Sequence, residues 1–88
     1  MKAMTKRATI KWIKQQFKRN SDCTIRLLTF KKDRMLTIVK RGVTFDVIEA
    51  GFNHCQYSDL DSKAAFHLVK KLLELEFPRS HMVYCDLS

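Results

Sequence analysis

Residues 35–49 read MLTIVKRGVTFDVIE, and this stretch decides the fold class. Residues 35–39 and 43–49 are rich in β-branched side chains, which favour extended strands. Between them, residues 40–42 end on Gly42, which can adopt the positive φ that a tight turn requires. The second strand alternates, with one face formed by Val43, Phe45 and Val47 and the other by Thr44, Asp46 and Ile48. The stretch therefore predicts an antiparallel hairpin.

Further strands are expected on both sides of this hairpin. Residues 23–30 favour an extended chain, and residues 31–34 form a short polar turn that leads into the hairpin. After the hairpin, residues 52–57 are a weaker strand, and residues 82–87 alternate weakly and return as a last strand. Because short turns join most neighbours, the sequence predicts a mainly antiparallel sheet of three to five strands.

A first helix is predicted at residues 9–19. Its apolar residues recur at the spacing of a buried helical stripe and are Ile10, Ile13 and Phe17. Its N-cap is either Thr9 or Thr5, and the second alternative adds a turn to the helix.

A second helix is predicted at residues 58–76, with Ser58 as its N-cap and Asp61 three residues further on. The expected core stripe consists of Ala65, Leu68, Val69, Leu72 and Leu75. Pro78 ends this helix, because the residue before a proline is pushed out of the helical region.

The expected fold class is therefore α+β, in the order α-β-β-β-(β)-α-(β). Two helices on one face of the sheet give a two-layer sandwich. With 88 residues, of which 45% are hydrophobic, the chain is expected to form a single domain over residues 1–88. Residues 1–8 are expected to be a flexible basic N-terminus.

The positive charge is concentrated at one end of the chain. The formal net charge is +8, from 17 Lys and Arg residues against nine Asp and Glu residues. Residues 1–21 contain seven of the basic residues and none of the acidic ones, so residues 22–88 are close to neutral. The basic character therefore belongs mainly to the first helix.

Four of these basic side chains form a ridge on that helix. At 100° per residue they fall within a sector of about 60°, beside the apolar stripe, and they are Arg7, Lys11, Lys14 and Lys18. Because like charges at this spacing repel, an unmixed ridge favours a polyanionic partner. We therefore predict a small nucleic-acid-associated protein that binds the phosphate backbone of DNA or RNA. The predicted phosphate-binding residues are Arg7, Lys11, Lys14, Lys18, Arg19, Lys31, Lys32 and Arg34.

The alternative is a protein-protein interaction module that docks on an acidic partner without binding nucleic acid. Edge strands at either end of the sheet can pair with another copy, so a homodimer is also considered.

No pattern predicts an enzyme, a metal site or a cofactor. His81 and Cys85 form a single pair at ligand spacing, which is weak evidence for zinc. Nothing in the spacing of Asp46 and Glu49 relative to the other acidic residues indicates a nuclease site. The three cysteines are an odd number at wide spacing, which favours free thiols in a reducing compartment, and a cytoplasmic location is expected. The chain also lacks the run of about 20 apolar residues that a membrane-spanning helix needs.

Overall fold

The computed structural model describes residues 2–19, 21–29, 34–51, 53–78 and 81–88. Within these residues the elements follow the order β1 (Lys2–Thr5), α1 (Lys6–Phe17), β2 (Cys23–Leu28), β3 (Met35–Arg41), β4 (Thr44–Ala50), β5 (His54–Leu60), α2 (Ser62–Glu76) and β6 (Met82–Leu87).

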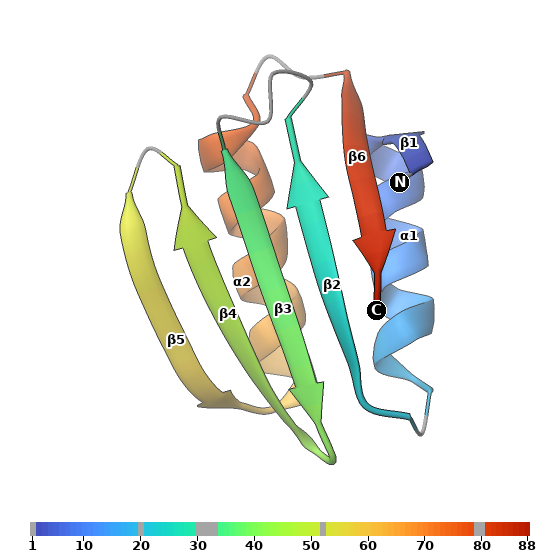
Figure 1. Cartoon of the computed structure of the whole chain (residues 1–88), viewed down its shortest axis with the longest axis vertical. Coiled ribbons are helices and arrows are strands. Elements are labelled where there is room, and N and C mark those ends of the chain that lie inside the picture. Colours follow the sequence, from blue (N-terminus) through green and yellow to red (C-terminus); the bar gives the residue numbers. More distant parts are fainter. Residues whose placement is uncertain (1, 20, 30–33, 52, 79–80) are drawn as a thin grey trace.

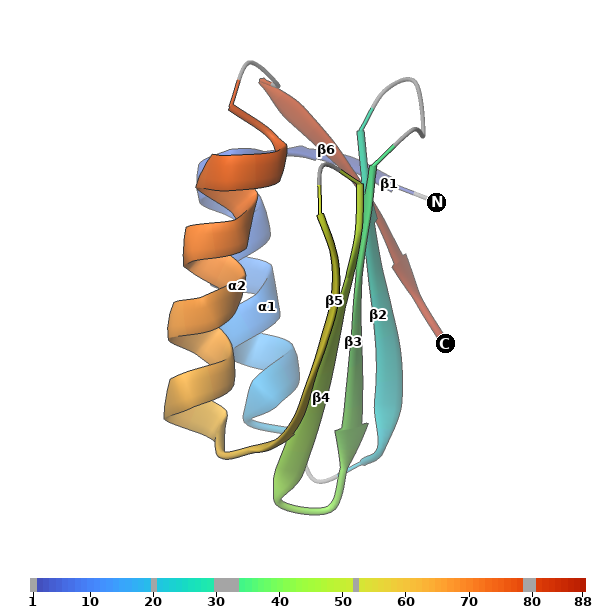
Figure 2. The same ribbon diagram turned by 90° about the vertical axis from the view of Figure 1, so that its left-hand side faces the viewer.

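The strands form one sheet in the order β1-β6-β2-β3-β4-β5, and every neighbouring pair is antiparallel. Figure 1 shows the sheet from its open face. In Figure 2 both helices lie on the same side of the sheet, and they run in opposite directions. The predicted α+β class and its two layers are confirmed. In the described part of the chain, neither helix is long and apolar enough to cross a membrane.

The predicted strand count was too low, because the described residues form a six-stranded sheet. The strand that sequence reasoning did not find is β1, which lies in the segment expected to be a flexible N-terminus. It pairs with β6, from Lys2 opposite Cys85 to Thr5 opposite Met82. A four-residue strand carries too little periodicity to be found in the sequence, and its pairing depends on a strand about 80 residues away.

The predicted central hairpin is confirmed, with Met35 opposite Ala50, but its turn is shorter than predicted. Lys40 and Arg41, expected in the turn, belong to β3, where Arg41 lies opposite Thr44. Gly42 takes a φ of 60° at the tip of the hairpin, which is a conformation that glycine adopts without strain. The tip is also tied to the start of β2, because the Asp22 carboxylate accepts a 2.9 Å hydrogen bond from the Gly42 N–H. Val43, predicted to begin the second strand, lies in the turn instead and is 85% exposed.

The first helix begins earlier than residues 9–19 suggested, because Thr5 is its N-cap. The Thr5 hydroxyl accepts a 3.1 Å hydrogen bond from the Ala8 N–H. Thr9 lies inside the helix, where its hydroxyl donates to the Thr5 carbonyl at 2.8 Å and is fully buried. The alternative that placed the cap at Thr5 is therefore the correct one.

The second helix begins later than predicted, and Ser58 is not its N-cap. Asp61 caps the helix and accepts a 2.7 Å hydrogen bond from the Ala64 N–H. Residues 58–60 continue β5 instead. Asp46 holds this part of β5 by accepting a 3.1 Å hydrogen bond from the N–H of Asp59, whose φ is 58°. The strand thus extends three residues beyond the predicted 52–57, and Phe52 lies outside the described residues.

The core fills the space between the sheet and the two helices. Its buried apolar residues are Ile13, Phe17, Ile25, Leu27, Leu36, Ile38, Phe45, Val47, Ala65, Val69, Leu72, Leu73, Phe77, Val83 and Cys85. The predicted stripe of α2 was wrong at Leu75, which is 49% exposed. Leu73 and Glu76 face the core instead, because the side of α2 that packs on β4 is rotated slightly from the predicted stripe.

Candidate nucleic-acid interface

The four ridge residues are all exposed: Arg7, Lys11 and Lys14 on α1, and Lys18 as its C-cap. Their exposure follows from how α1 packs, because its other side faces the sheet and buries Thr9, Ile13, Gln16 and Phe17. The described residues of α1 include no acidic side chain. The ridge therefore reaches solvent without an acidic neighbour on its own helix.

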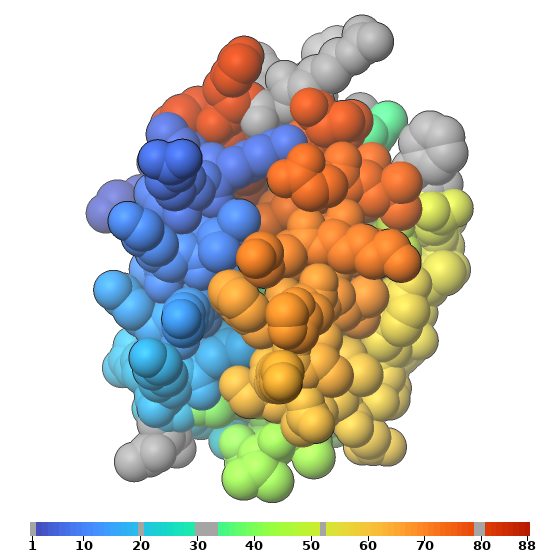
Figure 3. All heavy atoms as spheres, turned by 180° about the vertical axis from the view of Figure 1, so that it is seen from behind, coloured from blue at the N-terminus to red at the C-terminus, as the bar shows by residue number. Residues whose placement is uncertain are grey.

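Helix α2 places further basic residues beside this ridge. The rings of Phe17 and Phe66 meet edge to face, with centroids 6.3 Å apart, so the C-terminal half of α1 lies against the N-terminal half of α2. Figure 3 shows the two helices in contact along the face of the molecule opposite the open sheet. Lys63 and Lys70 precede and follow Phe66 by three and four residues, so both lie on the α1-facing flank of α2. The ammonium of Lys70 is 5.7 Å from the centroid of the Phe66 ring.

A groove of about 280 Å³ lies where the two helices meet, and its lining residues are Lys14, Phe17, Lys18, Ser62, Lys63 and Phe66. The two phenylalanines provide its apolar surface, and three lysines from two helices surround it. Helix α2 and its cap also contribute acidic side chains, Asp61 and Glu74. Asp61 is engaged as the helix cap, and Glu74 is exposed one turn after Lys70. Sequence reasoning missed Lys63 and Lys70, because α2 mixes charges and only the packing of the helices brings its lysines to the ridge.

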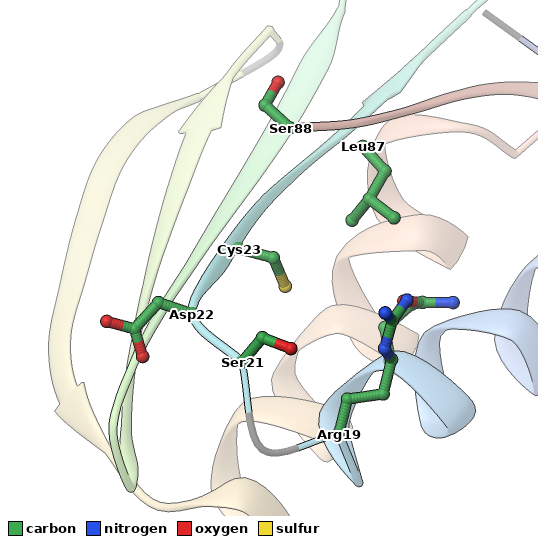
Figure 4. Close-up of a pocket in the computed structure, with 7 residues that line it drawn as sticks. Arg19, Ser21, Asp22, Cys23, Leu87 and Ser88 are labelled. Atoms are coloured by element: carbon green, nitrogen blue, oxygen red, sulfur yellow. The ribbon is translucent and has the colours of Figure 1, made fainter.

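Arg19 lies at the end of this surface, beside a second hollow of about 180 Å³ between the end of α1, the start of β2 and the end of β6. Its guanidinium donates a 3.2 Å hydrogen bond to the side-chain oxygen of Gln16. In Figure 4 the Cys23 thiol and the Leu87 side chain point into the hollow, and the Asp22 carboxylate points away from it. Arg19 is thus exposed and has no acidic partner among the hydrogen bonds and ion pairs of the described residues.

Of the remaining predicted residues, the structure describes only Arg34, which is not part of this surface. Lys31 and Lys32 lie outside the described residues. Arg34 precedes β3, and its guanidinium donates a 2.8 Å hydrogen bond to the Glu76 carbonyl at the last residue of α2. That end of α2 is the one opposite the groove. Trp12 is partly buried on the other flank of α1, where it lines a hollow with Met4 and Cys85.

The cysteines and histidines were considered as possible metal ligands, and the described ones lie in different surroundings. Cys85 is buried in the core, 3.7 Å from the Thr9 hydroxyl, and burial raises the pKa of its thiol. Cys55 is exposed on the edge strand β5, and His67 is exposed on α2. The described residues contain no group of three or more His, Cys, Asp or Glu side chains that could hold a metal ion.

The acidic residues of β4 lie on opposite faces of the sheet. Asp46 forms an ion pair with Arg41 and accepts a hydrogen bond from the Asp59 N–H. Glu49 faces α2, where it is 2% exposed and lies next to Glu76, which is 1% exposed. The described acidic residues of the β3–β4 hairpin therefore do not converge on a nuclease-like cluster.

The carboxyl pair of Glu49 and Glu76 is a buried feature that the sequence did not reveal. Hydrogen bonding to Glu76, burial and repulsion by Glu76 raise the pKa of Glu49, while the side chains of Asn53 and Tyr57 oppose this shift. One carboxyl oxygen of Glu49 has no hydrogen-bond partner. Glu76 is held by the Asn53 N–H, which donates to its carboxylate at 3.1 Å. The pair joins β4 to the end of α2 and stays away from the basic surface.

Replacing Gly51 by alanine is expected to destabilise the protein by about 1–3 kcal/mol, because an added methyl group overpacks this site. A Cβ at Gly51 would lie 2.7 Å from the Glu76 carboxylate and 3.0 Å from Arg34 Cβ. Urea unfolding of Gly51→Ala, Glu76→Ala and the double variant measures the effect. The two changes should be less than additive, since the second removes the oxygen that the methyl group meets. Strict additivity would contradict the clash.

Comparison with known proteins gives no relative, since no protein-family model, curated protein or solved structure matches this chain. Any functional conclusion therefore depends on the surface itself.

Proposed function

We propose that this protein binds the phosphate backbone of nucleic acid through α1, without catalysing a reaction. The observation that supports the proposal is the exposed ridge of Arg7, Lys11, Lys14 and Lys18 on a helix whose described residues include no acidic side chain. Arg19 extends this ridge beyond the helix, and Lys63 and Lys70 widen it on α2.

The physical basis is the release of counterions. Each phosphate that a lysine or arginine neutralises frees condensed cations from the nucleic acid, so affinity falls steeply as salt rises. Such contacts carry no information about sequence. Four to seven of them are expected to give weak binding that is sensitive to salt and similar on all sequences.

The test is fluorescence anisotropy with labelled duplex DNA, single-stranded DNA and RNA over a series of salt concentrations. A plot of log affinity against log salt should have a slope of about −3 or steeper. The variant Lys11→Glu/Lys14→Glu should bind at least about tenfold more weakly at low salt. Its slope should be shallower by about one for each phosphate that is no longer neutralised.

A matched control separates the ridge from net charge. The double variant Arg26→Glu/Lys71→Glu changes the net charge by the same amount at positions outside the ridge. Arg26 lies on β2, where it forms an ion pair with Asp86, and Lys71 lies about 100° around α2 from Lys70. This control should bind within about twofold of the unchanged protein once general charge effects are screened at moderate salt. If both variants lose affinity equally, or if the unchanged protein does not bind at low salt, the proposal is wrong.

A further inference from the structure

The groove between α1 and α2 combines two chemical features that the phosphate backbone alone would not use. Its apolar surface comes from Phe17 and Phe66, and Phe66 is only partly buried. Lys14, Lys18 and Lys63 line the same groove. Binding to phosphates alone requires the lysines but gains nothing from an exposed aromatic surface between them.

An unpaired nucleotide has the matching pair of features. Its base is a flat ring that stacks on aromatic side chains, and the phosphates on either side of it are anions. In a duplex the ring faces of the bases are stacked on one another, and only base edges, sugars and phosphates are exposed. The groove can therefore receive a base from a single strand and cannot receive one from an intact duplex.

Resting on the proposed function above, we infer that this groove binds an unpaired base of single-stranded nucleic acid against Phe66, with Lys14, Lys18 and Lys63 neutralising the flanking phosphates. The ammonium of Lys70 lies over the Phe66 ring, 5.7 Å from its centroid, so a base that stacks on this face displaces the flexible Lys70 side chain, which can then pair with a flanking phosphate. Asp61 keeps its negative charge while it caps α2 through the Ala64 N–H at 2.7 Å, but the three lysines that line the groove outnumber it. The protein thus prefers single strands to duplexes.

The experiment compares four probes of equal length at one low salt concentration: oligo(dT), oligo(U), the duplex of the first, and a deoxyribose-phosphate strand whose bases are replaced by abasic spacers. The abasic strand keeps the phosphates and removes the rings. The single strands with bases should bind about tenfold more tightly than the abasic strand, as expected for one stacked base. Comparing oligo(dU) with oligo(U) in addition shows whether deoxyribose or ribose is favoured, since these two strands differ only in the sugar.

Variants at Phe66 test the role of the ring. Phe66→Leu keeps an apolar side chain in contact with Phe17, so the fold should be retained, and circular dichroism checks this. Its affinity for oligo(dT) should fall to that of the abasic strand, while its affinity for the abasic strand stays within about twofold of the unchanged protein. Phe66→Tyr retains the ring and should restore the preference for bases.

The negative results have different meanings. Equal affinity of the unchanged protein for oligo(dT) and the abasic strand overturns this inference and leaves backbone binding intact. Absence of binding to all four probes at low salt overturns both. A loss in Phe66→Leu that is equal for oligo(dT) and the abasic strand also overturns the inference, because the ring would then act only through the fold.

Discussion

Replacing Phe45 by alanine is expected to lower the free energy of unfolding by about 3–5 kcal/mol. The side chain is 2% exposed, and its ring lies 4.3 Å from that of Phe17, measured between centroids. Phe45 thus joins the central hairpin to α1, and Phe17 in turn supports Phe66 in the groove. Removing it leaves a cavity where the sheet and the helix meet.

A loss of this size is a large part of the roughly 5–15 kcal/mol typical of a small domain, so the variant should unfold at a much lower urea concentration than the unchanged protein. Urea unfolding followed by circular dichroism measures the change. Val43→Ala is the matched control, because it lies two residues away at 85% exposure and should change stability by about 0.5 kcal/mol or less. A loss below about 1 kcal/mol in Phe45→Ala would contradict the packing of this residue.

Replacing Glu49 by glutamine is expected to stabilise the protein by about 1–3 kcal/mol at pH 8, because it removes an incompletely bonded carboxylate from a buried site. The gain should depend on pH. Hydrogen bonding to Glu76 and burial raise the pKa of Glu49 above its ordinary value of 4.5, so the folded protein holds this proton more tightly than the unfolded chain. This contribution to stability is complete below pH 4.5 and is lost as the pH rises through the raised pKa.

The measurement is the free energy of unfolding of both proteins at several values between pH 4 and pH 8. The difference between Glu49→Gln and the unchanged protein should be smallest at the acid end and grow as the pH rises, since glutamine resembles the protonated carboxyl group. Glu74→Gln is the control, because Glu74 is exposed on the same helix as Glu76 and should show no such trend. A difference that is constant or shrinks with rising pH would show that Glu49 is not held as described.

The candidate surface could be predicted only in part. The spacing of Arg7, Lys11, Lys14 and Lys18 placed them on one side of a helix, and the structure has all four exposed there. The sequence did not indicate that the ridge is joined by Lys63, Phe66 and Lys70, because nothing within α2 shows which of its flanks meets α1. Arg34 was placed among the phosphate ligands for its charge alone, and its hydrogen bond to the Glu76 carbonyl involves residues 42 positions apart.

The sequence by itself determined the features that depend on neighbouring residues. The alternation of residues 35–49 with Gly42 at the turn specifies the hairpin, and the helical spacing of the basic residues specifies the ridge. These patterns can be read locally, because backbone periodicity fixes which side chains share a face.

Only the tertiary structure decided the pairing of β1 with β6, the N-cap of α2 at Asp61, the buried contact of Glu49 with Glu76, and the groove between the helices. Each of these brings together segments that are distant in the chain, or extends a strand at the expense of a helix through a contact with its neighbour. The free energies of these contacts depend on packing between elements, which the local propensities of the residues do not determine.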